Sequence, residues 1–166
     1  MTRRLLLRAP REDDLDAWAA LHADFEVMRW LGRDRALDRD EAWRELSYLL
    51  GHWELRGFGQ WVLERLDTGD LVGRAGLYLP EGWPGLEVGW TLARPQWGKG
   101  FATEAGHASL DWAFAQLDAD HVISLIAPGN ERSRRVAERL GETYEGRTRV
   151  RGHLVHIYGI DRPSYA

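Results

Sequence analysis

Three strand-like segments follow one another in the middle of the chain with no helix between them. Residues 60–66, 71–79 and 86–92 are rich in apolar and β-branched residues. The turn sequence Asp67-Thr68-Gly69-Asp70 joins the first two, and a loop of Pro and Gly over 80–85 joins the last two. Short connections of this kind give antiparallel neighbours, because parallel strands need a crossover of a dozen or more residues. The chain therefore cannot be a regular alternation of strands and helices around a parallel sheet.

Helical spacing of apolar residues flanks this meander on both sides. It predicts helices over 12–23, from an N-cap at Asp38 to about Gly57, over 103–117 and over 131–140. Asp38 and Glu41 have the spacing of a capping box. Further strands are predicted over 5–7, 121–127, 143–151 and 154–160. The order β-α-α-β-β-β-α-β-α-β-β predicts one α+β domain over residues 1–166, with a mixed, mostly antiparallel sheet of about seven strands and about four helices.

Composition excludes several classes of function. The 166 residues carry a net charge of −4, so no basic footprint indicates nucleic acid as a partner. The chain has no cysteine, which excludes a disulfide scaffold, a thiolate metal site and a cysteine nucleophile. His153 and His156 would face opposite ways on a strand, so we predict no metal site. No apolar run approaches the ~20 residues of a membrane span, and we expect a cytoplasmic protein without a membrane partner.

A loop with two glycines, residues 94–100, lies between a strand and an alanine-rich helix. The first turn of a helix leaves backbone N–H groups unpaired, and glycine lets an anion approach them closely. A P-loop is excluded, because Arg94 and Gly100 stand where Gly and Ser or Thr are required. A dinucleotide fingerprint is matched by Gly98 and Gly100 but has Thr103 at its third glycine. The remaining interpretation is a loop for the pyrophosphate of an acyl-CoA.

Two segments resemble the acetyl-CoA site of the GNAT superfamily of N-acetyltransferases. They are Leu86–Leu92 with Trp97–Ala105, and Asn130–Ser133 with Arg135–Gly141. The nearest branch is that of the ribosomal-protein N-terminal acetyltransferases, in which Trp97 is a variant of the family's Gln or Arg. The resemblance spans nearly the whole chain. It implies a fold in which the strand before the loop splays from the next, and acetyl-CoA as cosubstrate with no metal. The CoA-binding residues that it implies are Trp90, Thr91, Leu92, Trp97, Gly98, Lys99, Gly100, Phe101, Ala102, Thr103, Asn130 and Ser133.

Acetyl transfer to an amine needs a neutral nucleophile, so the enzyme needs a base. Glu87, on the strand that leads to the loop, is our candidate, with a solvated strand glutamate as the alternative. Glu87→Gln is then expected to lower kcat mainly at low pH. His22 and Glu26 are weaker candidates near the acceptor. Many family members have a tyrosine as the general acid where this chain has Ala137. Ser133 is our candidate donor to the leaving sulfur, with a plain helix-start serine as the alternative.

The sequence thus predicts an acyltransferase that moves an acetyl group from acetyl-CoA to a primary amine by direct transfer in a ternary complex. The acceptor is left open between a protein N-terminus and a small-molecule amine, and a homodimer is left open too. A CoA-binding sensor that has lost catalysis and a nucleotide-binding oxidoreductase are the alternatives. The tryptophans ahead of the loop, Trp30, Trp61, Trp83 and Trp90, are expected in the core more than in an acceptor site.

Overall fold

A computed structural model describes residues 1–163 of the chain. The elements are, in order, β1 (Leu5–Arg8), η1 (Glu12–Asp14), α1 (Leu15–His22), α2 (Phe25–Met28), η2 (Arg29–Leu31), α3 (Arg39–Arg56), β2 (Gln60–Arg65), β3 (Leu71–Tyr78), β4 (Glu87–Leu92), η3 (Arg94–Gln96), α4 (Phe101–Gln116), β5 (His121–Ile126), α5 (Glu131–Leu140), β6 (Thr143–Val150) and β7 (His153–Asp161). The η elements are single 3₁₀ turns.

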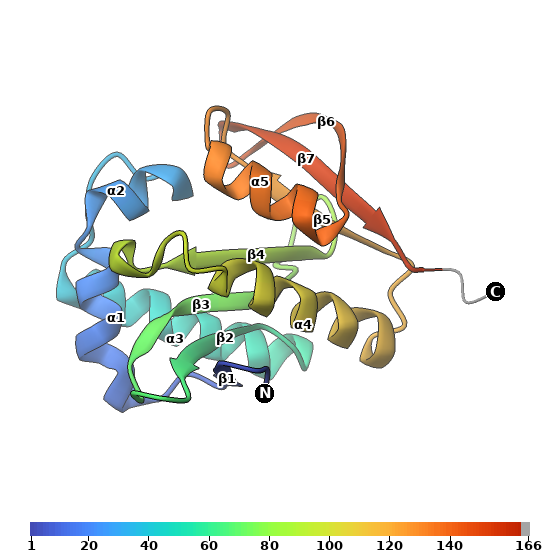
Figure 1. Cartoon of the computed structure of the whole chain (residues 1–166). Coiled ribbons are helices and arrows are strands. Elements are labelled where there is room, and N and C mark those ends of the chain that lie inside the picture. The colour runs from blue at the N-terminus through green and yellow to red at the C-terminus, as the bar shows by residue number, and fades with distance from the viewer. Residues whose placement is uncertain (164–166) are drawn as a thin grey trace.

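Within the described residues, the seven strands form one sheet in the order β1-β2-β3-β4-β5-β7-β6. Every neighbouring pair is antiparallel except β4 and β5, which run parallel. Helices α1 and α3 cover one face of the sheet, and α4 covers the other (Figure 1). The predicted α+β class and mixed, mostly antiparallel seven-stranded sheet are confirmed.

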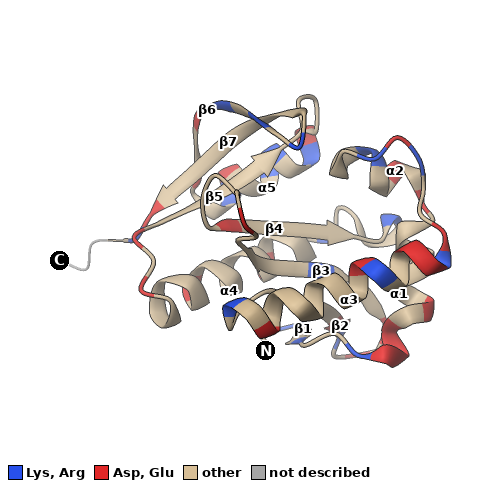
Figure 2. Cartoon of the chain, turned by 180° about the vertical axis from the view of Figure 1, so that it is seen from behind, with Lys and Arg blue, Asp and Glu red and all other residues tan. Residues whose placement is uncertain are grey.

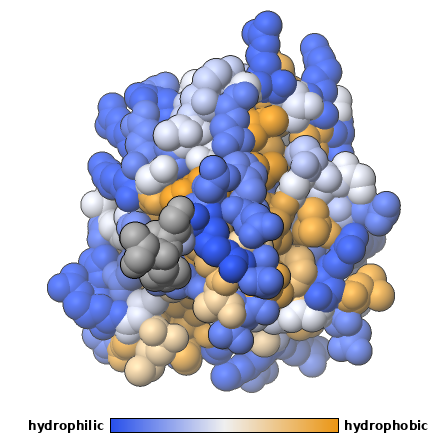
Figure 3. Space-filling view, turned by 90° about the vertical axis from the view of Figure 1, so that its right-hand side faces the viewer, coloured by the Kyte–Doolittle hydropathy of each residue, from blue (hydrophilic) through white to orange (hydrophobic). Residues whose placement is uncertain are grey.

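Two apolar layers hold these helices to the sheet. Trp18, Ala42, Leu46 and Leu49 of α1 and α3 pack with Val62 of β2. On the opposite face, side chains of α4 pack with those of β1 to β4: Leu5, Leu63, Val72, Ala75, Leu92, Phe101 and Ala105. The face seen in Figure 3 is largely hydrophilic, with apolar side chains in separate small groups. The packing thus fixes β3 and β4 between the two layers, where the cavity described below begins.

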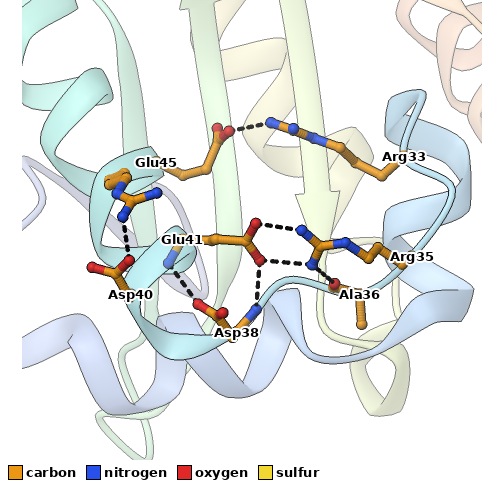
Figure 4. A network of polar contacts seen from close by, with 8 residues as sticks. Arg33, Arg35, Ala36, Asp38, Asp40, Glu41 and Glu45 are labelled. Atoms are coloured by element: carbon orange, nitrogen blue, oxygen red, sulfur yellow. Dashed lines mark hydrogen bonds and ion pairs between the residues drawn. The ribbon is translucent and has the colours of Figure 1, made fainter.

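Local signals explain where the helices begin and end. The Asp38 side chain accepts a hydrogen bond from the Glu41 amide, and the Glu41 carboxylate accepts one from the Asp38 amide, as the capping box predicts. Helix α3 then stops at Gly57, and α5 stops at Gly141, both in the left-handed region. Figure 4 shows the capping box among the ion pairs around the start of α3.

The structure departs from the predicted helices at two places. The predicted helix over 12–23 is the turn η1 followed by α1, and a further short helix, α2, follows it. Helix α4 begins at Phe101, two residues before the predicted Thr103, because Gly100 takes the N-cap position with φ 82°. Its first amides therefore lie directly on the glycine loop. No helix within residues 1–163 is both long and apolar enough to cross a bilayer.

Candidate active site

A cavity of about 1150 Å³ crosses the sheet region between β4 and β5. One part is walled by the loop before α4, the start of α4 and the face of α5. The other part is walled by α2, η2, α3, β3 and the turn between β6 and β7. We call these the loop half and the sheet half. Every residue that the resemblance implies for CoA, and the base candidate Glu87, lines this one cavity.

The cavity exists because β4 and β5 separate soon after they meet. Their only register pair is Glu87 with Ile123, beside a hydrogen bond of 2.8 Å from the Ile123 amide to the Leu86 carbonyl. Beyond that point β4 continues as Trp90, Thr91 and Leu92, which line the cavity and pair with β3 on their other edge. The edge that faces β5 has no partner strand there, although the Leu92 carbonyl accepts a hydrogen bond from the Trp97 side chain. An open strand edge can hydrogen-bond an extended amide chain, as in strand addition.

The loop half ends at a set of free backbone amides. Gly98 and Gly100 have φ of 76° and 82°, left-handed conformations that favour glycine. Among residues 1–163, none of the amides of 98–103 donates to another protein group. These amides include the first turn of α4, where the helix dipole adds partial positive charge. Such a concave set of N–H groups binds anions.

Side chains hold this loop in place. Trp97 donates its indole N–H to the Leu92 carbonyl at 2.8 Å, which ties the loop back to β4. Arg132 of α5 lies over the Trp97 ring, 4.7 Å from its centroid. Arg4 donates to the Lys99 carbonyl at 2.9 Å and pairs with Glu104. Lys99 donates to Gln96 at 3.0 Å and lines the cavity. The loop is thus fixed from both ends while its amides stay free.

Asn130 and Ser133 lie at the start of α5. The Asn130 side-chain oxygen accepts the Ser133 amide at 3.2 Å, so the predicted helix cap is present. Its side-chain NH₂ group has no partner among the described residues, and neither has the Ser133 hydroxyl. Both residues line the cavity. Ala137 is fully buried against Ile126 and Tyr158, and its own side chain has no hydroxyl at the position where the resemblance implies a tyrosine.

Glu87 lies at the boundary between the two halves. The Trp83 indole donates to its carboxylate at 2.6 Å, and the same side chain faces Gly89. Removal from water raises the pKa of Glu87 to about 7, against the opposing effects of the Trp83 hydrogen bond, the Arg74 charge and the Leu125 amide. A carboxyl group with this pKa is half ionised near neutral pH, which suits a general base.

Of the two weaker candidates for the base, His22 lies at the cavity and Glu26 does not. His22 lines the cavity, is buried, and hydrogen-bonds the Trp18 carbonyl through Nδ1 at 2.8 Å. Burial and the charge of Arg74 lower the pKa of His22 to about 4, so its ring is neutral at pH 7. Glu26 does not line the cavity and pairs with Arg29 at 3.2 Å on the surface.

The tryptophans also divide. Trp61 packs against Trp53 and Trp112, as expected for the core. Trp90 packs against three apolar clusters, also as expected for the core, and lines the cavity as predicted for a CoA-binding residue. Trp30 and Trp83 line the cavity and belong to none of the apolar clusters of the described residues, so the expectation of core positions is wrong for these two. The reason is that the cavity replaces part of the core where β4 and β5 diverge.

Sequence reasoning missed the polar residues of the sheet half. Gln60, Arg74 and Tyr78 line it together with Glu45 and Tyr48. Arg74, Tyr78 and Glu87 share one face, because β3 and β4 are in register with Arg74 opposite Thr91 and Tyr78 opposite Glu87. A sequence reader could have found Arg74 and Tyr78 by assuming that β3 and β4 form a hairpin and taking every second residue on the face of Glu87.

Basic residues outnumber acidic ones around the cavity. Figure 2 shows them on α5, around the turn between β6 and β7, and around α2. They are Arg29, Arg33, Arg74, Lys99, Arg132, Arg135, Arg139 and Arg151, against Glu45, Glu87 and Glu104. Among residues 1–163 no group of three or more His, Asp or Glu side chains has metal-binding geometry. The cavity therefore favours an anionic ligand.

Comparisons with known proteins agree with this geometry. Residues 4–143 match the family model described as an acetyltransferase (GNAT) domain. The chain is 27% identical over 163 residues to "Uncharacterized N-acetyltransferase p20" of Bacillus licheniformis, covering 95% of this chain and 91% of that protein. The acetyltransferase of Agrobacterium tumefaciens has a TM-score of 0.86 at 29% identity, with 98% of this chain and 93% of that chain covered. RimL, a ribosomal L7/L12 N-acetyltransferase solved with coenzyme A, shares the fold at TM-score 0.77 and 19% identity, with 96% and 95% covered.

Proposed function

The chain belongs to the GNAT family of acetyltransferases and carries out acetyl transfer that depends on acetyl-CoA, and we propose that its acceptor is a primary amine acetylated within a ternary complex. The observation that supports the acceptor side is the continuous cavity, which joins free loop amides to a carboxylate of raised pKa. The chain has no cysteine, so no cysteine can carry the acetyl group between the substrates.

The loop half suits coenzyme A. In our proposal the amides of 98–103 bind the pyrophosphate, with Lys99 beside them. The open edge of Trp90, Thr91 and Leu92 pairs with the amides of the pantetheine chain, and the Asn130 side chain donates a further hydrogen bond. The substituents at Gly98 and Gly100 are hydrogen atoms, which leaves room for the phosphates to approach the backbone.

Two side chains take part in the chemistry that we propose. The Glu87 carboxylate removes a proton from the amine, directly or through one water, as the nitrogen attacks the thioester carbonyl. The C–N bond forms, the C–S bond breaks, and the Ser133 hydroxyl donates a hydrogen bond to the departing sulfur. A thiol has a pKa near 8.5, so this leaving group needs only modest help. Ser133 has that freedom because no acceptor among the described residues holds its hydroxyl.

We treat residues 1–166 as one catalytic domain, because elements from α1 to β7 contribute to the walls of one cavity. A protein N-terminus and a small-molecule amine both remain acceptors within this proposal. A CoA-binding sensor without turnover is the second candidate, favoured by Ala137 in the place of the tyrosine.

A screen of amines with acetyl-CoA, read by release of free thiol, tests the proposal. We expect thiol release that depends on one class of amine and a product heavier by one acetyl group in mass spectrometry. A parallel titration measures CoA binding, with NAD as the comparison ligand. CoA binding without turnover on any amine favours the sensor, whereas binding of NAD in preference to CoA overturns both candidates.

A further inference from the structure

Arg74 is a cation in the sheet half that no carboxylate neutralises. Its Nη1 donates to the side-chain oxygen of Gln60, and its guanidinium lies 5.9 Å from the centroid of the Trp18 ring. No carboxylate within residues 1–163 lies within ion-pair distance of it, and its buried Nε has no acceptor. Nη2 has no protein acceptor either, although Arg74 lines the cavity. Two of the three guanidinium nitrogens are therefore left without a partner.

Several arginines near the start of the sheet are paired with carboxylates. Arg132, Arg135, Arg139 and Arg151 line the cavity without an ion pair, as Arg74 does, but among the arginines of the cavity only Arg74 has a buried nitrogen without a partner within residues 1–163. Arg8 is held by Asp14 and Glu64 at 2.6 and 2.7 Å. Figure 4 shows Arg33 paired with Glu45 and Arg35 paired with Glu41 around the start of α3. Glu45 lines the cavity but is taken by Arg33 at its rim. Arg74 is half-buried, and its Nε is shielded from solvent. A charge in such a place is costly unless it is paired, which indicates that the partner of Arg74 comes with a ligand.

Arg74 and Glu87 stand at opposite ends of one short surface. On β3, Gly76 separates Arg74 from Tyr78, and on β4, Gly89 separates Glu87 from Thr91, with the two glycines opposite each other. Arg74 and Glu87 are therefore offset by four residues along the paired strands, which separates their Cα atoms by about 13 Å in the strand direction. Both side chains are long, so their charged groups can lie closer together than their Cα atoms. The two groups act on each other, because the Arg74 charge lowers the pKa of Glu87.

Gln60 completes a binding site for an anion. Its oxygen is occupied by Arg74, which turns the side-chain NH₂ toward Gly89, where a Cβ would stand 3.0 Å from Nε2. That NH₂ group has no acceptor among the described residues. The Nη2 group of Arg74 and the side-chain NH₂ of Gln60 thus offer N–H donors beside one positive charge, and a carboxylate can accept such charge-assisted hydrogen bonds.

On the basis of the proposed function, we infer that the acceptor is an amine that also bears a carboxylate, which Arg74 and Gln60 bind while the amine faces Glu87. The carboxylate is either that of a free amino acid or that of an acidic side chain next to the N-terminus of a peptide. A polyamine is disfavoured, because it would bring positive charge beside Arg74 and Arg151.

The test compares paired acceptors in the wild type, Arg74→Met, Arg74→Lys and the control Arg44→Met, whose arginine is exposed on α3 and outside the cavity. One pair is an amino acid and its carboxamide, and the other is a dipeptide amide with Asp or Asn at its second position. Each rate is divided by the fraction of the acceptor whose amine is uncharged at the assay pH, so that a difference in amine pKa within a pair does not affect the comparison. We expect kcat/KM for the carboxylate member to fall about 10–100-fold in Arg74→Met, mainly through KM, with the neutral member little changed. If Arg74→Met lowers the carboxylate preference only in the first pair, the acceptor is a free amino acid. If it does so only in the second pair, the acceptor is a peptide.

Arg74→Lys is expected to recover part of the preference, since it restores the charge but not the planar donors. Arg74→Met should also move the lower midpoint of the pH–rate profile upward, because a cation near Glu87 is lost. Equal use of both members by the wild type overturns the inference and leaves the acetyl transfer standing. Thermal stabilisation by carboxylate ligands that needs Arg74, without any turnover, overturns the proposed function and leaves the anion site standing. If the wild type shows no preference for the carboxylate acceptors and carboxylate ligands do not stabilise it, the proposed anion site is wrong.

Discussion

Replacement of Glu87 by Gln is the sharpest test of the base, because the two side chains have the same shape. The amide oxygen can still accept the Trp83 indole N–H, which is 2.6 Å from the carboxylate in the wild type. The change therefore removes the basic oxygen and its charge while it keeps the wall of the cavity. Acetyl-CoA affinity should stay nearly constant, since the proposed CoA contacts lie on the loop half.

The raised pKa of Glu87 sets the size of the loss at each pH. A positioned base contributes about 10²–10⁴-fold, so kcat/KM should fall by that factor above pH 8, where Glu87 is ionised. With a pKa of about 7, roughly one Glu87 in eleven is ionised at pH 6. At pH 6 most wild-type molecules therefore lack an ionised Glu87, whereas Glu87→Gln lacks this base at every pH. The deficit of the variant should therefore be about tenfold smaller at pH 6 than at its maximum.

This reverses the expectation from sequence, which placed the largest loss at low pH. That expectation rested on the amine, which most needs deprotonation at low pH. A glutamate with an ordinary pKa of about 4.5 would give a constant ratio between pH 6 and 9. Ionisation of the amine affects both proteins equally and cancels in the ratio. Desolvation of Glu87 is the physical cause of the difference.

Thiol release measured from pH 5 to 9 gives kcat/KM for both proteins, and a CoA titration at pH 7 gives affinity. Glu81→Gln is a matched control, because the Glu81 side chain is fully exposed in the loop before β4. Its profile should follow that of the wild type. A wild-type to Glu87→Gln ratio that is flat across this range would refute a base with a pKa near 7, and a ratio near one would return Glu87 to a structural role.

Three further changes test other parts of the site. Gly100→Val places a β-branched residue at φ 82° beside the free amides, so CoA affinity should fall at least tenfold in a protein that still folds, as measured by titration and circular dichroism; wild-type affinity would contradict the loop assignment. Ser133→Ala should lower kcat roughly 10–100-fold with little change in acetyl-CoA affinity, measured by steady-state kinetics, and loss of affinity alone would make Ser133 a binding residue. Burial raises the pKa of Glu142 to about 8, above its unfolded value, so its contribution to stability falls as pH rises from about 4.5 to 8. Glu142→Gln should remove that fall, about 1.4 kcal/mol per pH unit, in urea unfolding at pH 5 and 8; the same slope in both proteins would show that Glu142 is ionised when folded.

The parts of the fold that sequence predicted are those with local causes. The capping box at Asp38 and the end of the same helix near Gly57 each act within a few residues. Helix α4 is instructive, because the periodic apolar pattern places its start at Thr103. Gly100, read only as an anion-binding residue, is also its N-cap.

The sheet half was missed because it depends on register between strands. Arg74 reads as an ordinary strand arginine until Thr91 is known to be its partner across β3 and β4. Glu142 likewise reads as a residue after a helix, yet it is buried and accepts a hydrogen bond from Ser124 of β5. Burial of a polar group is a property of the assembled sheet, and no pattern within ten residues encodes it.

The separation of β4 from β5 has a consequence for self-association. An open strand edge ordinarily invites pairing with a strand of another molecule, and sheets protect their outer edges against this with charge or cover. Here the open edge is internal to the sheet, with α4 and α5 beside it and the loop of 94–100 at its mouth (Figure 1). A thin flexible chain can enter where a second polypeptide with side chains on both faces cannot. The fold thereby keeps a strand edge free for a ligand without making it a site of aggregation.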